Sequence, residues 1–498
     1  MALESKLITK LEPSIELDKL KFKAYNEKEG DNPGDNNTTR DLGMEFPLVM
    51  INNYRFSQED IVSFEIDMDG MLPTISLTVT DSRSQFTIES FPRDGDVINV
   101  RLASRAKSTY KDIRIDFDID SVDSPARSNM DYGTGTAKFT FTGKMKVPGL
   151  FAEGCKSYGV GTTINHLESI ATDLQLGLAT NVDTTDDEMN LLTTYEPLSD
   201  TLADLVKHSY VSDEAFQTFS IDPYYYINYV DLNKLLNAEE SFENSLAALD
   251  VDMNDILHPD SDETVNEMET ALILSSHSKL EGTNIHVRKY SLKNQSGKKV
   301  KQHGYKRVLQ YFENDSEEGL VNFDVEALTS ERMLDIEAPL RGRQDEERYK
   351  QEVKYKYVGR RNSDPETSNT HLNYNFAEIH NTQNIEELDK LKLEVELSSW
   401  NPAIYKWQKI PVVIFSQIQN QIEADTIVKK KKEELGMDVN KPADLEDEQS
   451  DKSAVDDFLS GFYVVGGIKY VYRKSDQQIR QRMTLLRREW PVRVNNLG

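Results

Sequence analysis

The chain has 498 residues, of which 38% are hydrophobic and 29% are charged, and its formal net charge is −28. This length allows about three domains of ordinary size, each with its own hydrophobic core. So acidic a chain is a poor general ligand for nucleic acid or anionic lipid, because both need a cationic surface.

Targeting and redox signals are sparse. No apolar run approaches the ~18 residues needed to span a bilayer. The first residues lack the basic and apolar segments of a secretory signal, so we expect synthesis in the cytosol. The single cysteine, Cys155, excludes an intrachain disulfide. We interpret it as a small apolar filler.

The N-terminal third is predicted to be an extension followed by a β-barrel. Residues 1–43 form the extension, because the stretch 26–40 is too polar to bury a core. Strict alternation of apolar and polar residues follows, most clearly over 113–120 and 137–147. Period-two alternation is typical of strands with one buried face. We therefore predict a small antiparallel barrel over 44–150.

The pattern changes after residue 150. Apolar residues at helical spacing predict a helix over 164–174 that Gly177 can end, and a second helix around Leu202 to Val206. An aromatic strand is predicted over 221–230. Residues 151–236 are therefore interpreted as a mixed α/β domain.

The remainder of the chain alternates between polar segments and strands. Residues 237–278 are predicted to be an acidic linker, and 279–428 a second β-barrel region. A polar insert over 429–457 precedes the last segment, 458–498, whose strands are predicted to complete the fold.

Motifs for catalysis or metal binding are incomplete. Asp116, Asp118 and Asp120 have the spacing that opens a calcium loop, but Ser121 and Arg127 stand where such a loop needs Gly and Glu. No zinc-protease, nucleophile-elbow or phosphate-loop pattern occurs, and the histidines are scattered. We therefore predict no catalytic residue, no cofactor and no metal site, and a protein that is not an enzyme.

The C-terminal segment is locally basic. Residues 469–493 hold eight Lys or Arg and two acidic residues. This excess suits a contact with an acidic partner surface or with the acidic linker of the chain itself. The alternative is ordinary arginines on the solvent face of strands. The candidate contact residues are Arg480, Arg482, Arg487, Arg488 and the neighbouring Trp490.

Several segments, taken in order, resemble a known family. They are the helix at 164–174, the runs 184–190 and 207–210, the aromatic run 221–229 with Tyr224, Tyr225 and Tyr226, and the ending from 461–465 to 485–490. Together they resemble the central baseplate hub protein of contractile-tailed bacteriophages. The resemblance covers about 44–236 and 458–491 and rests on no catalytic residue.

The resemblance implies a mainly β fold with a smaller α/β part. It implies two tail-tube-like antiparallel β-barrels, a mixed α/β insert and assembly as a trimeric ring. Such a ring is a structural adaptor in the virion's tail baseplate. It joins a three-fold central spike to a six-fold tail tube or tube-initiator protein, with a tape measure protein as a further partner, and DNA passes through its channel without specific binding.

Two other classes remain open at this stage. One is a hub or tail protein with cell-wall hydrolase activity, since paired carboxylates cannot be picked out of so acidic a sequence. The other is a trimeric receptor-binding tail protein, which exposed aromatic platforms would favour.

Overall fold

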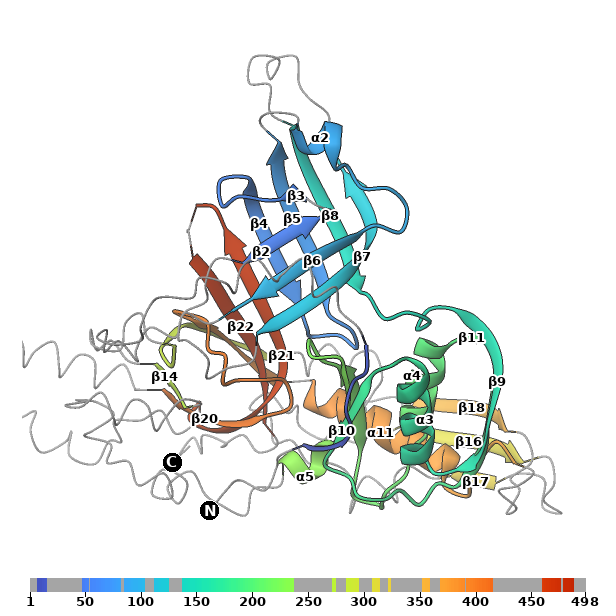
Figure 1. Ribbon diagram of the computed structural model, residues 1–498. Coiled ribbons are helices and arrows are strands. Elements are labelled where there is room, and N and C mark those ends of the chain that lie inside the picture. Colours follow the sequence, from blue (N-terminus) through green and yellow to red (C-terminus); the bar gives the residue numbers. More distant parts are fainter. Residues whose placement is uncertain are drawn as a thin grey trace, which may run out of the picture.

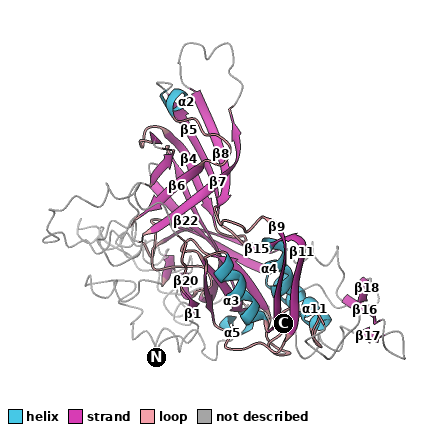
Figure 2. Cartoon of the chain, turned by 45° about the vertical axis from the view of Figure 1, so that its right-hand side comes forward, coloured by secondary structure: helices cyan, strands magenta, loops and turns pink. Residues whose placement is uncertain are grey.

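The computed structural model describes residues 7–15, 47–52, 54–81, 85–103, 112–124, 137–236, 271–274, 284–294, 307–313, 321–323, 352–358, 368–389, 391–414, 459–475 and 478–487. The fold is mainly β, as predicted, with a few helices gathered beside one sheet (Figures 1 and 2). Most of the predicted linker 237–278 and all of the predicted insert 429–457 lie outside the described residues. The domain boundaries stay predictions.

One large curled sheet dominates the described residues and has 13 strands. Its main path, in spatial order, is β15 (Val287–Asn294), β19 (Leu391–Leu397), β22 (Gln478–Leu486), β21 (Gly461–Arg473), β4 (Ile61–Asp67), β5 (Thr74–Asp81), β8 (Ala137–Met145), β7 (Ile113–Asp123), β6 (Val97–Leu102), β2 (Leu48–Ile51) and β3 (Tyr54–Arg55). From β21 the sheet branches to β20 (Lys409–Ile414), which pairs in parallel with β14 (Leu272–Leu274). A short helix, α2 (Gln85–Glu89), follows β5.

The C-terminal strand β21 joins the two strand-rich regions. It pairs antiparallel with β22 on one side and with β4 on the other, where Tyr470 lies opposite Ile66. Its long apolar pattern fits this place, because both of its neighbours are strands and most of its side chains are buried. The regions predicted as two barrels are therefore continuous through hydrogen bonds, and the final segment completes the sheet.

A smaller α/β unit packs below the large sheet (Figure 1). Its four-stranded sheet runs β1 (Ile8–Leu11), β10 (Gly177–Thr180), β13 (Tyr226–Asp231) and β12 (Gln217–Ile221). The ribbon of β9 (Glu153–Gly161) and β11 (Met189–Pro197) stands beside it. The helices are α3 (Thr163–Asp173), α4 (Leu198–Lys207), α5 (Leu232–Leu236) and α11 (Tyr374–Leu388). Apart from these, β16 (Arg307–Glu313), β17 (Val321–Phe323) and β18 (Glu352–Val358) form a separate sheet.

Several sequence predictions hold in detail. In β7 the apolar residues Ile113, Ile115 and Phe117 are buried while Asp118 and Asp120 are exposed, so these aspartates lie on a solvent face. The two predicted helices are α3 and α4. Periodicity identified these elements because each has one apolar face against the core.

Other predictions are wrong. The strand predicted over 221–230 is a hairpin, with a turn between β12 and β13. Gly177 does not end α3, because Gln175 takes the left-handed conformation there (φ 58°). Gly177 instead allows close packing, since a Cβ on it would come within 2.4 Å of the Tyr226 ring. Cys155 is exposed on the β9 ribbon and fills no core.

Two segments lie in unexpected places. β1, from the predicted N-terminal extension, pairs antiparallel with β10 and becomes an edge of the α/β sheet. The helix α11 lies within residues predicted to be the second barrel, yet it contacts α4 and reaches β12 through hydrogen bonds. The chain thus returns to the α/β unit between strands of the large sheet.

Candidate functional site

A cavity of about 420 Å³ marks the junction of the large sheet and the α/β unit. Strands β7 and β21 of the large sheet contribute to it, as do β1, β10, β12 and β13 of the α/β unit, the hairpin turn, and the loops after β4 and β19. Its lining residues are Leu7, Thr9, Met68, Ile113, Ala179, Ile221, Asp222, Pro223, Tyr224, Tyr226, Asn228, Trp400, Pro402, Ile404, Tyr405, Lys406, Ile468 and Tyr470. Five aromatic side chains among them give the cavity a mainly apolar wall.

The turn between β12 and β13 follows from an Asp-Pro pair. The Tyr225 N–H donates to the Asp222 carbonyl at 3.1 Å, which closes a four-residue turn with Pro223 in its second position. The Asp222 carboxylate accepts the N–H groups of Tyr224 and Tyr226 at 2.9 Å each. Asp at the first position and Pro at the second are the residue types that such turns favour.

The three tyrosines that the sequence singled out therefore play different parts. Tyr225 adopts φ 68°, is only 2% exposed, and accepts the Asp116 N–H on its hydroxyl at 3.2 Å. Tyr224 and Tyr226 are partly buried in the cavity wall. Tyr226 donates to the Glu12 carboxylate beside β1. Burial, together with that carboxylate, raises the pKa of Tyr226 to about 12.

Lys406 is the principal polar clamp of the junction. Its ammonium group donates to the carbonyls of Met68, Asp69 and Gly70 at 2.8–3.0 Å, so it binds the loop after β4. Burial lowers the pKa of Lys406 to about 8, against the opposing effect of Asp69 and Asp67. All three of its donors are used, so Lys406 holds two loops together and has no donor left for a ligand.

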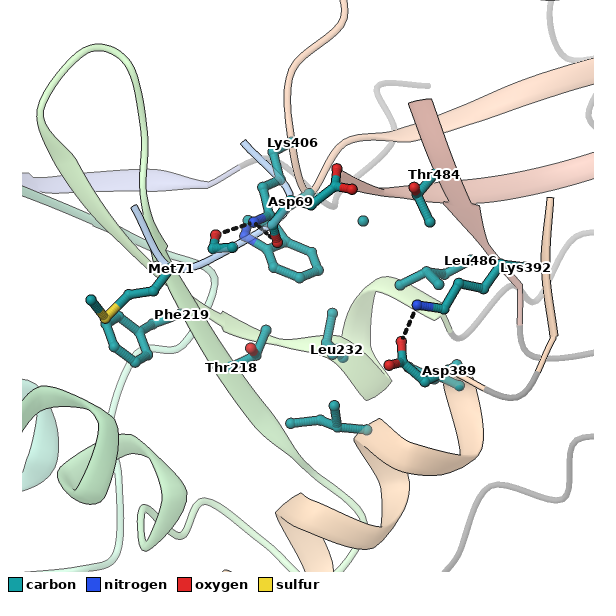
Figure 3. Close-up of a pocket in the computed structure, with 15 residues that line it drawn as sticks. Asp69, Met71, Thr218, Phe219, Leu232, Asp389, Lys392, Lys406, Thr484 and Leu486 are labelled. Atoms are coloured by element: carbon teal, nitrogen blue, oxygen red, sulfur yellow. Dashed lines mark hydrogen bonds and ion pairs between the residues drawn. The ribbon is translucent and has the colours of Figure 1, made fainter. Parts of the chain in front are cut away.

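A second cavity of about 320 Å³ is also lined by Lys406 (Figure 3). Trp407 lines it in a left-handed conformation (φ 68°) and donates its indole N–H to the Ser220 hydroxyl at 2.9 Å. An ion pair of Lys392 with Asp389 at 2.9 Å closes the far end. The Lys406–Trp407 segment thus links the large sheet to β12.

Charged groups also join β21 to the β4–β5 loop. Lys469 contacts the Asp67 and Asp69 carboxylates at 2.6 and 3.2 Å. Burial alone would lower the pKa of Lys469, but these two carboxylates outweigh it and raise the pKa. Gly467 leaves room for Asp69, because a Cβ there would lie 2.0 Å from the Asp69 Oδ1.

Three arginines of the C-terminal segment, Arg480, Arg482 and Arg487, are engaged within the chain. Arg480 and Arg482 on β22 contact the two carboxylate oxygens of Glu396 on β19, at 3.2 and 2.9 Å. Arg487 donates to the Ser460 carbonyl at 2.9 Å and lies 5.5 Å from the centre of the Tyr463 ring. These arginines therefore link β22 to β19 and the end of β22 to the start of β21.

The other two candidates from this segment, Arg488 and Trp490, lie outside the described residues. Sequence reasoning missed Lys406, Trp407, Asp69 and Glu396. The only local signal was the Gly466–Gly467 pair inside an apolar strand, which indicates a close approach of another segment.

The cavities offer little chemistry. The Asp222 carboxylate is used by the turn and by the Asn228 amide at 3.2 Å, and Lys406 is used by three carbonyls. In the described part of the chain, no group of three or more His, Cys, Asp or Glu is placed to hold a metal ion. None of the described helices has the length and apolar character of a membrane span. The junction cavity can receive an apolar side chain.

Comparison with solved structures gave matches at low identity. The 43 kDa tail protein of prophage MuSo2 from Shewanella oneidensis is 9% identical, with a TM-score of 0.47 over 89% of this chain and 98% of that one. A tail protein from Neisseria meningitidis MC58 is 7% identical, with a TM-score of 0.42 over 89% and 96%. The E. coli c3393 protein, a component of the type VI secretion system, is 9% identical, with a TM-score of 0.38 over 89% and 78%. No family model and no curated protein matches the sequence.

Proposed function

We propose that the chain is the structural hub of a phage tail baseplate. In this function three copies form a ring that joins the three-fold central spike to the six-fold tail tube or its initiator protein. The ring forms part of the channel through which DNA leaves. The protein acts by shape and contact and catalyses no reaction.

The continuity of the large sheet through β21 is the observation that carries this proposal. β21 pairs with β4 of the N-terminal strand region and with β22, which continues to β19 and β15. One chain therefore holds two strand-rich regions in a fixed relation. Three copies would present six such regions, which is what a three-fold object needs to meet a six-fold one.

The junction supports the same reading. Lys406, Lys469 and Trp407 connect the large sheet to the loop after β4 and to β12. An adaptor that transmits force between a spike and a tube needs rigid connections between its parts. In the junction cavity the Asp222 carboxylate and the Lys406 ammonium group are both engaged by the chain itself, which favours a structural role over the hydrolase alternative.

The partners follow from this place in the virion. They are two further copies of the chain, the spike protein on one face, the tube or tube-initiator protein on the other, and a tape measure protein in the channel. The protein would be made in the host cytoplasm and assembled into the tail.

Negative-stain imaging and sedimentation of the purified full chain test the proposal. We expect a three-fold ring with a central opening and a mass three times that of the 57.0 kDa chain. A compact monomer at all concentrations would contradict it. Turnover of peptidoglycan that one carboxylate substitution abolishes would instead support the hydrolase alternative.

A further inference from the structure

Among the described residues, strand β15 ends the large sheet with an open side. It pairs with β19 from Val287 to Asn294, and on its other side β14 reaches only its beginning, through a bridge between Ile273 and His286. All residues from Arg288 to Lys293 are exposed. An exposed edge strand is a template for pairing with another chain unless something covers it.

The exposed part of β15 is basic and partly apolar. Lys293 pairs with Glu394 of the neighbouring strand. Arg288 and Lys289 have no ion-pair partner among the described residues. Tyr290 and Leu292 are 38% and 36% exposed on one face of the strand. In a chain of net charge −28, this concentration of positive charge at a free edge stands out.

The end of β7 has the complementary character. β6 pairs with β7 only from Ile113 to Asp118, whereas β8 pairs with it as far as Asp123. Within the described strands, Ile119–Asp123 therefore pairs with β8 on one side only. Its other side, beyond the end of β6, is an open edge. Asp120 and Asp123 are exposed there and have no ion-pair partner among the described residues.

The two edges are not neighbours in the strand order of one chain. Six strands separate β15 from β7 along the sheet, namely β19, β22, β21, β4, β5 and β8. A second copy brings a basic edge to an acidic one, and the same contact then repeats head to tail. Head-to-tail contacts between identical chains form a ring when the rotation from copy to copy closes, as in the proposed trimer, and an open filament when it does not.

We propose that β15 of one copy binds the free edge of Ile119–Asp123 in a second copy, which brings the positive charges of Arg288 and Lys289 near the carboxylates of Asp120 and Asp123. This inference rests on the proposed ring, for which it names the contact between subunits. Main-chain hydrogen bonds supply the pairing, and the opposite charges fix which edge meets which.

Charge reversal in the full chain tests the contact. One variant carries Arg288→Glu and Lys289→Glu, a second carries Asp120→Lys and Asp123→Lys, and a third combines all four changes. We expect each of the first two to need at least about tenfold more protein to assemble, and the third to recover, because both sides of the contact are then reversed. Sedimentation velocity across a concentration series gives the assembly constant.

Matched controls are Lys10→Glu on β1 and Asp183→Lys between β10 and β11, both exposed and both in the α/β unit, apart from the two edges. They should assemble as the parent does. Circular dichroism melting of every variant separates lost assembly from lost folding.

A cross-linking experiment covers variants that fold poorly. Ser291→Cys and Ser121→Cys are combined in a Cys155→Ser background, so that no other thiol remains, and treated with a bismaleimide. We expect covalent dimers and trimers from the paired variant and none from either single one.

The outcomes separate the contact from the function. A wild-type trimer that is insensitive to every reversal and gives no cross-link would overturn this contact and leave the proposed ring standing. A wild type that stays monomeric would overturn both. In a third outcome, the charge reversals leave self-assembly unchanged but prevent binding of a tube or spike protein. This result would assign the two edges to that partner and overturn the inference.

Discussion

Gln217 and Asn381, which are 164 residues apart in the sequence, are joined by a buried hydrogen bond of 3.1 Å from the Gln217 N–H to the Asn381 Oδ1. The Asn381 amide also donates to the carbonyls of Lys207 and Ser209, at 3.0 Å each. Asn381 thereby supplies hydrogen-bond partners to a backbone N–H of β12 and to backbone carbonyls at and after the end of α4. One side chain on α11 anchors that helix to the α/β unit.

Asn381→Ala should destabilise the α/β unit. The change leaves a buried N–H and two carbonyls without this partner, and each buried unsatisfied polar group costs about 1–3 kcal/mol. We expect the free energy of unfolding in urea to fall by at least one such contribution. Thr382→Ala, the next residue of the same helix, is the control and should change little. Equal stability of the two variants would contradict the anchoring role.

The same helix explains a limit of prediction from sequence. The elements α3 and β7 were predictable because their buried residues are apolar and periodic. On α11 several buried positions are Asn or His, including His380, Asn381 and Asn384, so no apolar stripe exists to detect. Hydrogen bonds to distant segments, together with the burial of Leu388 in the core, place this helix.

The candidate site was predictable only in part. The tyrosine run was found by its aromatic content, but its alternation hid the turn that Asp222 and Pro223 impose. Lys406 gives no signal, because its three carbonyl partners lie more than 300 residues earlier in the chain. Contacts of such sequence separation depend on strand order, and that order includes the β21–β4 pairing.

Gly467→Ala should weaken the junction. The new Cβ would lie 2.0 Å from the Asp69 Oδ1, so the carboxylate must move away from Lys469. Overpacking of this kind costs about 1–3 kcal/mol. Gly154→Ala on β9, where a Cβ meets nothing within 4 Å, is the matched control. A melting temperature that falls equally in both variants would argue against a specific clash.

Stability should fall as the solution becomes acidic through the histidine range. His371 donates from Nε2 to the His208 carbonyl at 2.8 Å and accepts the Asn373 N–H on Nδ1 at 3.2 Å, which requires the neutral ring. Burial lowers the pKa of His371 below its usual 6.5. The unfolded chain therefore binds a proton first as pH falls.

The stability that neutral His371 contributes is present above pH ~6.5 and decreases toward its lowered folded pKa, by up to about 1.4 kcal/mol per pH unit. His371→Gln should flatten this slope between about pH 6.5 and pH 5. His166, buried and lowered in pKa for the same reason, acts in the same direction. Urea unfolding of the wild type, of His371→Gln and of the double variant with His166→Gln, each over this pH range, measures how much each histidine contributes to the pH dependence of the free energy of unfolding. Identical slopes in all three would refute the assignment.

Charge should keep DNA from adhering to the proposed ring. Three copies carry a formal charge of 3 × −28 = −84, and unpaired carboxylates are costly to bury, so much of it faces solvent. Arg480 and Arg482 are engaged by Glu396, and Arg487 by the Ser460 carbonyl. These three arginines are thus engaged inside the chain, and a negative channel wall would repel phosphates.

We therefore expect no measurable affinity of the purified protein for duplex DNA at ~0.15 M salt, where screening extends over about 8 Å. Fluorescence anisotropy of a labelled duplex, repeated at lower salt, is the measurement. Glu396→Gln serves as a probe, because it releases Arg480 and Arg482 from their carboxylate. If these arginines lined the bore, the variant would gain DNA binding that weakens steeply with added salt, since each phosphate contact releases counterions. Such a gain, or tight binding by the wild type, would contradict an acidic channel.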